Sequence, residues 1–317
     1  MANTQTKKDS LIVAAIKVAR PLHWIKNVSI FAAIFLTGFI FNPTQIEKVI
    51  WAFVAFCLAS SATYVFNDIL DAKNDRLHPT KRFRPIASGS LPVPLALLEI
   101  VGLVFATLLI AIISPLNPLF LLLIVSYLVL QVFYSLRLKN IAILDILIIA
   151  TGFVMRVYAG AFAIDAHLSV WFLLCVISVA LFLAAGKRRA ELNLVQEDGL
   201  TRQSLSNYRK DLLNSYVTMF GNASWMSWAL FTFFESPKAT LPVWLALAEL
   251  SKTTTIDKLL MLTIPVTIFG IMRYEYLIFE GKSETPEKLL LTDEPLIIAV
   301  LLWTFLVYWV LYSGVAG

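Results

Sequence analysis

Nine long apolar runs constrain the fold of this chain more than any other feature of its sequence. A helix needs about 20 apolar residues to cross the hydrocarbon layer of a membrane, and each run approaches or exceeds that length. Hydrophobic residues make up 59% of the 317 residues and charged residues only 15%, which is too apolar for a soluble globular domain. We therefore predict an all-α, polytopic membrane protein. The predicted spans are residues 24–41, 49–66, 92–114, 118–134, 141–163, 168–186, 213–234, 257–279 and 295–313.

We expect these spans to form a single transmembrane domain over residues 1–317, of which residues 1–23 are an N-terminal interfacial segment. After a polar start, that segment carries an amphipathic stretch in which Leu11 and Ile16 oppose Lys17. A helix of this kind lies in the headgroup region rather than across the bilayer.

The basic residues predict the orientation of the spans. If the N-terminus is cytoplasmic, the inner segments carry 21 of the 26 Lys and Arg residues. By the positive-inside rule the N-terminus then lies in the cytoplasm and, after nine crossings, the C-terminus lies outside. The basic face meets anionic lipid headgroups of the bilayer, and no feature of the sequence indicates nucleic acid. The outer segments carry only Lys48, Lys238, Lys252 and Lys258.

One polar stretch, residues 67–89, separates the second and third spans. At about 100° per residue, Asn67, Asp68, Asp71 and Asp75 fall in roughly one quadrant of a helix, so three carboxylates and an amide oxygen converge. Oxygen ligands without Cys or His favour a hard cation such as Mg²⁺. The alternative is a solvated helix end whose acids balance nearby cations. The one-quadrant spacing at a membrane border favours the metal site.

Basic side chains gather at the inner ends of several spans. Guanidinium and ammonium groups beside a Mg²⁺ carboxylate cluster form the usual pocket for a diphosphate, because metal and basic donors share its charge. For those that end the sixth span, topological anchoring by snorkelling side chains is the alternative. They are Lys81, Arg82 and Arg84 after the acids, Arg137 and Lys139 with Tyr134 after the fourth span, and Lys187, Arg188 and Arg189 after the sixth.

Two ionisable residues lie inside the fifth predicted span: Asp145 one turn into it and Arg156 deeper, between Gly152 and Gly160. Eleven residues correspond to about 16 Å along a helix, so the two do not pair directly within that helix. Two interpretations of Arg156 remain open, since buried charges in membranes face a cavity or a partner. We favour a water-filled cavity over an acid on another span.

Three positions outside the polar stretch receive structural interpretations. Pro265 is expected to kink the eighth span. Asp293 fits a helix N-cap better than a catalytic role. An apolar stretch with prolines between residues 235 and 256 indicates a second interfacial segment.

The combined pattern resembles the UbiA superfamily of intramembrane transferases: nine spans, the Asn67 to Asp75 motif after the second, and a polar cluster after the fourth. Within it, further motifs resemble the decaprenyl-phosphate phosphoribosyltransferase branch, and the similarity covers almost the whole chain. These motifs are Arg20-Pro-Leu-His-Trp-Ile-Lys-Asn27, the run from Asp75 to Gly89, Tyr134-Ser-Leu-Arg-Leu-Lys139, Leu144-Asp145 through Arg156, Lys187-Arg-Arg-Ala-Glu-Leu192 and Pro286-Glu-Lys-Leu-Leu290.

The resemblance implies a fold of nine transmembrane helices around a central cavity, in a bacterial inner membrane. It implies transfer of 5-phosphoribose from phosphoribosyl diphosphate (PRPP) to a polyprenyl phosphate at the cytoplasmic face, with release of diphosphate. By the same resemblance, Mg²⁺ is held by Asn67, Asp68, Asp71 and Asp75. The implied catalytic residues are Asp68, Asp71, Asp75 and Asp145, and the implied substrate-binding residues are Lys26, Asn67, Lys81, Arg84, Tyr134, Lys139, Arg156, Lys187, Arg188 and Arg189.

Two other functions are weighed against this one. A prenyltransferase of the same superfamily would join a prenyl diphosphate to an aromatic acceptor, but the many cations suit two anionic substrates better. A transporter of anions or lipid phosphates would need polar residues reaching both faces, whereas the ionisable residues, Arg156 apart, cluster at the inner one. The oligomeric state stays open, and a homo-oligomer is compatible with the sequence.

Overall fold

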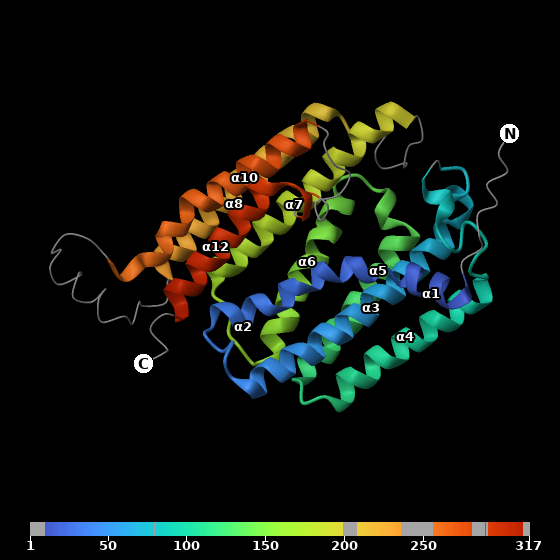
Figure 1. Cartoon of the computed structure of the whole chain (residues 1–317), viewed down its shortest axis with the longest axis horizontal. Coiled ribbons are helices and arrows are strands. Elements are labelled where there is room, and N and C mark those ends of the chain that lie inside the picture. The colour runs from blue at the N-terminus through green and yellow to red at the C-terminus, as the bar shows by residue number, and fades with distance from the viewer. Residues whose placement is uncertain are drawn as a thin grey trace.

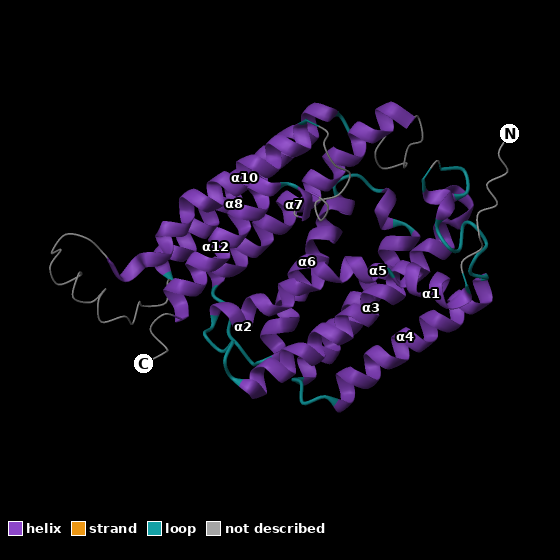
Figure 2. Ribbon diagram, in the orientation of Figure 1, coloured by secondary structure: helices purple, strands orange, loops and turns teal. Residues whose placement is uncertain are grey.

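The computed structural model of the chain describes residues 10–78, 80–198, 208–235, 256–280, 289 and 291–312. Within these ranges every regular element is a helix (Figure 2). Most of the predicted interfacial stretch at 235–256, the polar start at 1–9 and residues 286–288 lie outside the described residues. The predicted all-α architecture is confirmed for the described part of the chain.

Seven helices in the described residues are long and apolar enough to cross a membrane. They correspond to the second to sixth, eighth and ninth predicted spans. The eighth combines the end of a 3-10 helix, η5 (Ile256–Thr263), with α10 (Ile264–Phe279). The others are α3 (Pro43–Asp75), α4 (Val93–Ile113), α5 (Pro118–Leu136), α6 (Leu144–Ala163), α7 (Val170–Asp198) and α12 (Glu294–Tyr312).

The first predicted span differs from a regular transmembrane helix. It consists of a 3-10 helix, η1 (Pro21–Phe31), followed by the short α2 (Ala32–Leu36). A 3-10 helix is narrower than an α-helix, and η1 packs very closely on α6. A Cβ atom on Gly160 would lie 1.8 Å from the Ile30 carbonyl oxygen, so only glycine allows this contact.

The seventh predicted span corresponds to α8 (Lys210–Phe234), which is 25 residues long. At about 1.5 Å per residue this length is sufficient to cross a membrane. Its side chains are more polar than those of the seven apolar helices, because it carries Asn214, Asn222 and several serines and threonines. Two of the nine predicted spans, the first and the seventh, are therefore less regular or less apolar than expected.

The helices form two groups that meet at α6 (Figure 1). On one side α3 packs with α4 and α5, and on the other α7 and α8 pack with α10 and α12. α6 contacts α5 and α3 as well as α7. Side-chain contacts between the C-terminal ends of α3, α5 and α7 and the start of α6 place these ends together at one end of the molecule.

Local sequence explains where the helices begin. Asn42 caps α3 and Asn117 caps α5 through their side-chain oxygens, and a proline follows each in the first turn, where its missing N–H is not needed. The predicted N-cap is confirmed for Asp293, whose Oδ1 accepts from the Leu296 N–H at 3.0 Å. Pro265 lies in the first turn of α10, directly after η5, where its missing N–H is not needed. The predicted kink of the eighth span at this residue stays a prediction.

A helix, α1 (Leu11–Ala19), precedes η1 and packs against α3. Its small residues Ala14 and Val18 are buried, whereas Leu11, Ile12 and Ile16 are exposed. An exposed apolar face on a short helix is typical of elements that lie in the membrane interface. The interfacial position of this segment stays a prediction.

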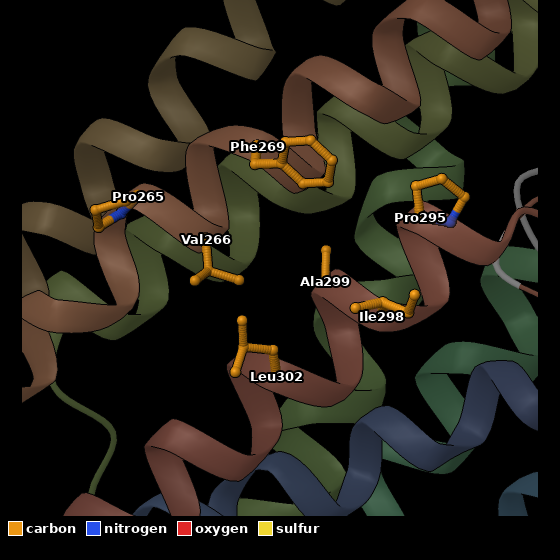
Figure 3. A pocket seen from close by; sticks show the side chains of 7 residues that line it. All are labelled: Pro265, Val266, Phe269, Pro295, Ile298, Ala299 and Leu302. Carbon is orange, nitrogen blue, oxygen red and sulfur yellow. The ribbon is translucent and has the colours of Figure 1, made fainter.

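A cavity of about 430 Å³ opens between α10 and α12 (Figure 3). Its lining contains no charged side chain, so it offers no donor for a phosphate or a metal ion. The charged residues expected from the sequence to form the site lie elsewhere, on α3, after α5, at the start of α6 and on α7. The cavity is lined by Pro265, Val266, Phe269, Pro295, Ile298, Ala299 and Leu302.

Candidate functional site

The acidic motif occupies the last turns of α3. The helix continues from the second predicted span to Asp75 without a break, which confirms that the motif extends this span. Asp68 and Asp75 are buried, with exposed fractions of 2% and 5%, and Asn67 and Asp71 are half-buried. Carboxylates in such sites require compensating charge, because burial removes the water that would otherwise solvate them.

Two arginines compensate Asp68 and Asp75. The Asp68 Oδ1 atom accepts from Arg20 NH2 at 2.5 Å and from Arg84 NH1 at 3.2 Å. Arg84 NH1 also donates to Asp75 Oδ2 at 2.7 Å. Arg84 follows the short 3-10 helix η2 (Lys81–Phe83), so the loop after the acids folds back onto them.

Lys139 compensates Asp71. It lies on the 3-10 helix η3 (Leu138–Asn140), which follows α5. Its Nζ donates to Asp71 Oδ1 at 2.6 Å and to Asn67 Oδ1 at 3.1 Å. The Asn67 amide in turn donates to Asp71 Oδ2 at 2.9 Å. Predicted site residues on α3 and after α5, some 70 positions apart in the sequence, are thus brought into direct contact.

The carboxylates share a helix face, and two of them meet at one cation: Arg84 NH1 donates to both Asp68 and Asp75, whereas Asp71 accepts from Lys139. In the part of the chain that the structure describes, no three acid, His or Cys side chains are arranged to hold a metal ion. The metal site at these residues stays a prediction. The donor set still fits Mg²⁺, since carboxylate and amide oxygens are its preferred protein ligands.

A second charged cluster lies between the start of α6 and the C-terminal half of α7. Arg188 Nε lies 2.6 Å from Asp145 Oδ2, and both side chains are fully buried. This contact is an ion pair without hydrogen-bond geometry. Arg188 NH2 donates to the Tyr134 hydroxyl at 2.9 Å, and its NH1 pairs with Glu191. The contacts of Arg188 thus join α5, α6 and α7.

Tyr208, just before α8, completes the surroundings of Asp145. Its hydroxyl donates to Asp145 Oδ1 at 2.7 Å and accepts from the backbone N–H of Ile143. Ile143 has a φ of +70°, which a β-branched residue rarely adopts. Burial raises the pKa of Tyr208 well above its usual value, and the hydrogen bond to Asp145 raises it further. The hydroxyl is therefore protonated at neutral pH and serves as a donor.

Arg156 lies within α6, away from both clusters. It makes four hydrogen bonds, from Nε to Asn27 Oδ1 at 2.7 Å, from NH2 to Tyr127 and Ser60, and from NH1 to the Gly152 carbonyl. Among the described residues, no acid lies within ion-pair distance of it. The alternative of an acid on another span is thus not observed there, and neutral groups on η1, α3 and α5 hold the guanidinium.

The other predicted binding residues lie on η1, η2 and α7. Lys26 is half-buried on η1, and Lys81 is exposed at the start of η2. Lys187 Nζ lies 4.0 Å from Glu191 Oε1. Arg189 is turned away from these groups, because its Nε donates to Asn214 on α8 at 2.5 Å and its guanidinium lies over the Phe279 ring.

Three residues of the site were not predicted. Arg20 and Glu191 are charged and belong to the motifs that carry the resemblance, so the sequence alone could have identified them as site residues. Tyr208 gave none, because a tyrosine between two spans is common. Its role depends on the fold bringing it to Asp145, 63 positions away.

The comparisons with known proteins identify the family. The chain matches the UbiA prenyltransferase family over residues 27–203, more than half of its length. The chain belongs to this family. The resemblance stated from the sequence is thereby confirmed.

Relatives of the chain include two with the same name. The decaprenyl-phosphate phosphoribosyltransferase of Corynebacterium glutamicum is 36% identical over 94% of this chain and 86% of the relative. The enzyme of that name from Mycobacterium tuberculosis is 34% identical over 93% of both chains.

A solved structure shares the fold. A UbiA homologue from Archaeoglobus fulgidus, bound to DMAPP and Mg²⁺, superimposes with a TM-score of 0.68 over 94% of this chain and 99% of that chain. The two sequences are only 16% identical, so this similarity concerns the fold alone. It supports a UbiA-type helical membrane fold for this chain.

Proposed function

We propose that the chain transfers 5-phosphoribose from PRPP to a polyprenyl phosphate and releases diphosphate. Family membership and the names of relatives that align over almost the whole chain support this activity. The observation that carries it is the gathering of Arg20, Arg84 and Lys139 beside the α3 acids. A donor with a diphosphate and a 5-phosphate, together with an acceptor phosphate, brings the anionic charge that such a gathering suits.

Mg²⁺ is the proposed cofactor. Asn67, Asp68, Asp71 and Asp75 would hold it, because they provide oxygen donors on one helix face. Bound to the diphosphate, the ion would neutralise negative charge that develops as this group leaves. The family neighbour bound to Mg²⁺ and DMAPP supports a divalent ion in this fold.

The chain's own residues position the two anionic substrates. Arg84 and Lys139, which already lie at the acids, would bind diphosphate oxygens. We propose that Lys26, Lys81 and Lys187 bind the remaining phosphates. The polyprenyl phosphate is already an anion, so it needs no general base, and the main tasks are positioning and reduction of charge repulsion.

Two predicted site residues receive a different role from the one the resemblance implied. Both oxygens of Asp145 are engaged by Arg188 and Tyr208, so Asp145 would position Arg188 rather than meet the ribose. Arg156 uses its donors on Asn27 and other neutral groups, so it would fix η1 against α6 rather than bind a phosphate.

The proposed topology has nine crossings around a central cavity in a bacterial inner membrane. The excess of Lys and Arg in the predicted inner segments supports a cytoplasmic N-terminus and a cytoplasmic site. A soluble phosphosugar would reach the site from the cytoplasm and the lipid phosphate from the bilayer. The C-terminus would lie outside.

The direct test supplies purified full-length protein in detergent with labelled PRPP, polyprenyl phosphate and Mg²⁺, and measures label in the lipid fraction. We expect Mg²⁺-dependent transfer that EDTA abolishes. Transfer of a prenyl group from a prenyl diphosphate to an aromatic acid, with no labelled lipid from PRPP, would instead identify a prenyltransferase and reject the proposal.

A further inference from the structure

The three acids proposed to hold the metal are already bound to cations of the chain. Asp68 contacts Arg20 and Arg84, Asp75 contacts Arg84, and Asp71 contacts Lys139, at 2.5 to 3.2 Å. A carboxylate oxygen that accepts from a guanidinium or ammonium group at this distance cannot ligate a metal ion through the same lone pair. A metal ion that binds these oxygen atoms would therefore displace the cations.

The position of Arg20 at Asp68 is fixed by several contacts. Its backbone has φ +52° and ψ +59°, the left-handed conformation that is uncommon outside glycine. Ser61 Oγ donates to the Ala19 carbonyl at 2.8 Å and accepts from Trp24 Nε1 at 3.0 Å, which ties both sides of this bend to α3. The Arg20 guanidinium also lies over the Tyr64 ring. A strained residue held by its surroundings in this way indicates a functional position.

The charges in this cluster are balanced and poorly solvated. Asp68, Asp75 and Lys139 are buried, whereas the side chains of Arg20 and Arg84 are 22% and 26% exposed. If one member of a buried ion pair loses its partner, the remaining charge carries an uncompensated desolvation cost. A metal ion alone would leave the cations unpaired, and a diphosphate alone would leave the acids unpaired. Both arriving together leave every charge compensated.

We propose that Arg20, Arg84 and Lys139 are exchangeable counterions, which balance the acids without substrate and move to diphosphate oxygens when a divalent metal takes the acids. This inference rests on the proposed function in that it assumes a metal–diphosphate occupant. It adds Arg20 to the site, and it predicts that metal and diphosphate bind with positive coupling, each favouring the other. Removal of one counterion therefore has opposite effects on the two ligands.

The test measures two separate binding constants of the full-length protein in detergent. Mn²⁺ is titrated without diphosphate and followed by electron paramagnetic resonance, and inorganic diphosphate is titrated in EDTA and followed by calorimetry. For Arg20→Met we expect the dissociation constant of Mn²⁺ to fall about tenfold and that of diphosphate to rise about tenfold, a size typical of coupled sites. Mn²⁺ binding that is unchanged or weaker in this variant would overturn the proposal.

Two control variants separate counterion exchange from general charge and folding effects. Lys73→Met removes an exposed cation from the last turn of α3, and should change both constants by less than about twofold. Arg20→Lys keeps the charge and should restore both constants towards the wild type. If Arg20→Met does not fold, Lys139→Met is used instead. We expect it to lower the dissociation constant of Mn²⁺ and to raise that of diphosphate, and the absence of these two shifts would equally reject the proposal.

These binding measurements are independent of the proposed reaction, because neither ligand carries ribose or a prenyl chain. Opposite shifts in a protein that transfers no phosphoribose would keep the counterion exchange and reject the proposed substrate. Transfer of phosphoribose without opposite shifts would keep the reaction and reject the exchange.

Discussion

The acids at the end of α3 and the acid at the start of α6 both pair with cations, but their surroundings differ. Asp71 and its partner Lys139 keep some exposure to solvent, as do the arginines at Asp68. Asp145 and Arg188 are completely buried and are held further by Tyr208 and Tyr134. The first cluster is accessible to a ligand, whereas the second is closed.

This difference indicates two roles for similar chemistry. Pairs that a ligand can reach can exchange partners, so the α3 cluster suits metal and phosphate binding. A closed pair cannot exchange without a large cost, because one buried charge would lose its partner. The Asp145–Arg188 pair therefore suits a fixed framework that joins α5, α6 and α7. Substitutions in the two clusters should separate activity from stability.

The largest expected effect is the loss of activity in Asp71→Asn. The amide has the size of the carboxylate but no charge for the metal, so transfer should fall to about one-hundredth or less. Stability should fall by less than the about 3–5 kcal/mol expected for a fully buried pair, because the Asp71 side chain is 29% exposed. Labelled-lipid transfer and thermal unfolding in detergent measure the two quantities.

Glu47→Gln, at the other end of α3, serves as the control and should retain activity. Full activity of Asp71→Asn would mean that the acids only form a solvated helix end.

The second effect is a loss of stability in Arg188→Met. Removal of the guanidinium leaves Asp145 buried without its charge partner, which costs about 3–5 kcal/mol. Thermal unfolding should shift strongly to lower temperature. Lys187→Met is the matched control on the same helix, and it should change stability by less than about 1 kcal/mol, since the Lys187–Glu191 pair is 4.0 Å long and partly exposed. If Arg188→Met and Lys187→Met were equally stable, the Asp145–Arg188 pair would not stabilise the packing of α5, α6 and α7.

The smallest effect is expected for Tyr208→Phe, which removes one hydrogen bond to Asp145 and should cost about 1–2 kcal/mol. Its pH dependence is specific. Because the folded pKa of Tyr208 is raised, its contribution should be complete below the unfolded value of about 10 and decline as pH rises through the higher folded value. Unfolding of wild type and variant from pH 7 to 11 measures this. Tyr216→Phe on α8 is the control. If the difference in stability between wild type and Tyr208→Phe grew with pH, this would contradict the role of the Tyr208 hydroxyl as a donor.

Much of the fold was predictable because hydrophobic length is read directly from sequence. Seven of the nine predicted spans correspond to helices apolar enough to cross a membrane. The 3-10 geometry of η1 was not predictable, since it depends on a backbone contact at Gly160 on a distant helix. The position of Pro265 in a first turn was missed for a related reason: the start of α10 is set by the preceding 3-10 helix.

The sequence by itself determined the acidic face at the end of α3, the basic segments beside it and the family to which they belong. Helical periodicity and local charge are short-range properties, so they can be read from neighbouring residues. Only the tertiary structure decided which cation meets which acid, that Asp145 is closed off by Arg188 and Tyr208, and that Arg156 is held by neutral groups. These pairings join side chains far apart in sequence, and burial, which depends on the whole fold, sets the cost of breaking each of them.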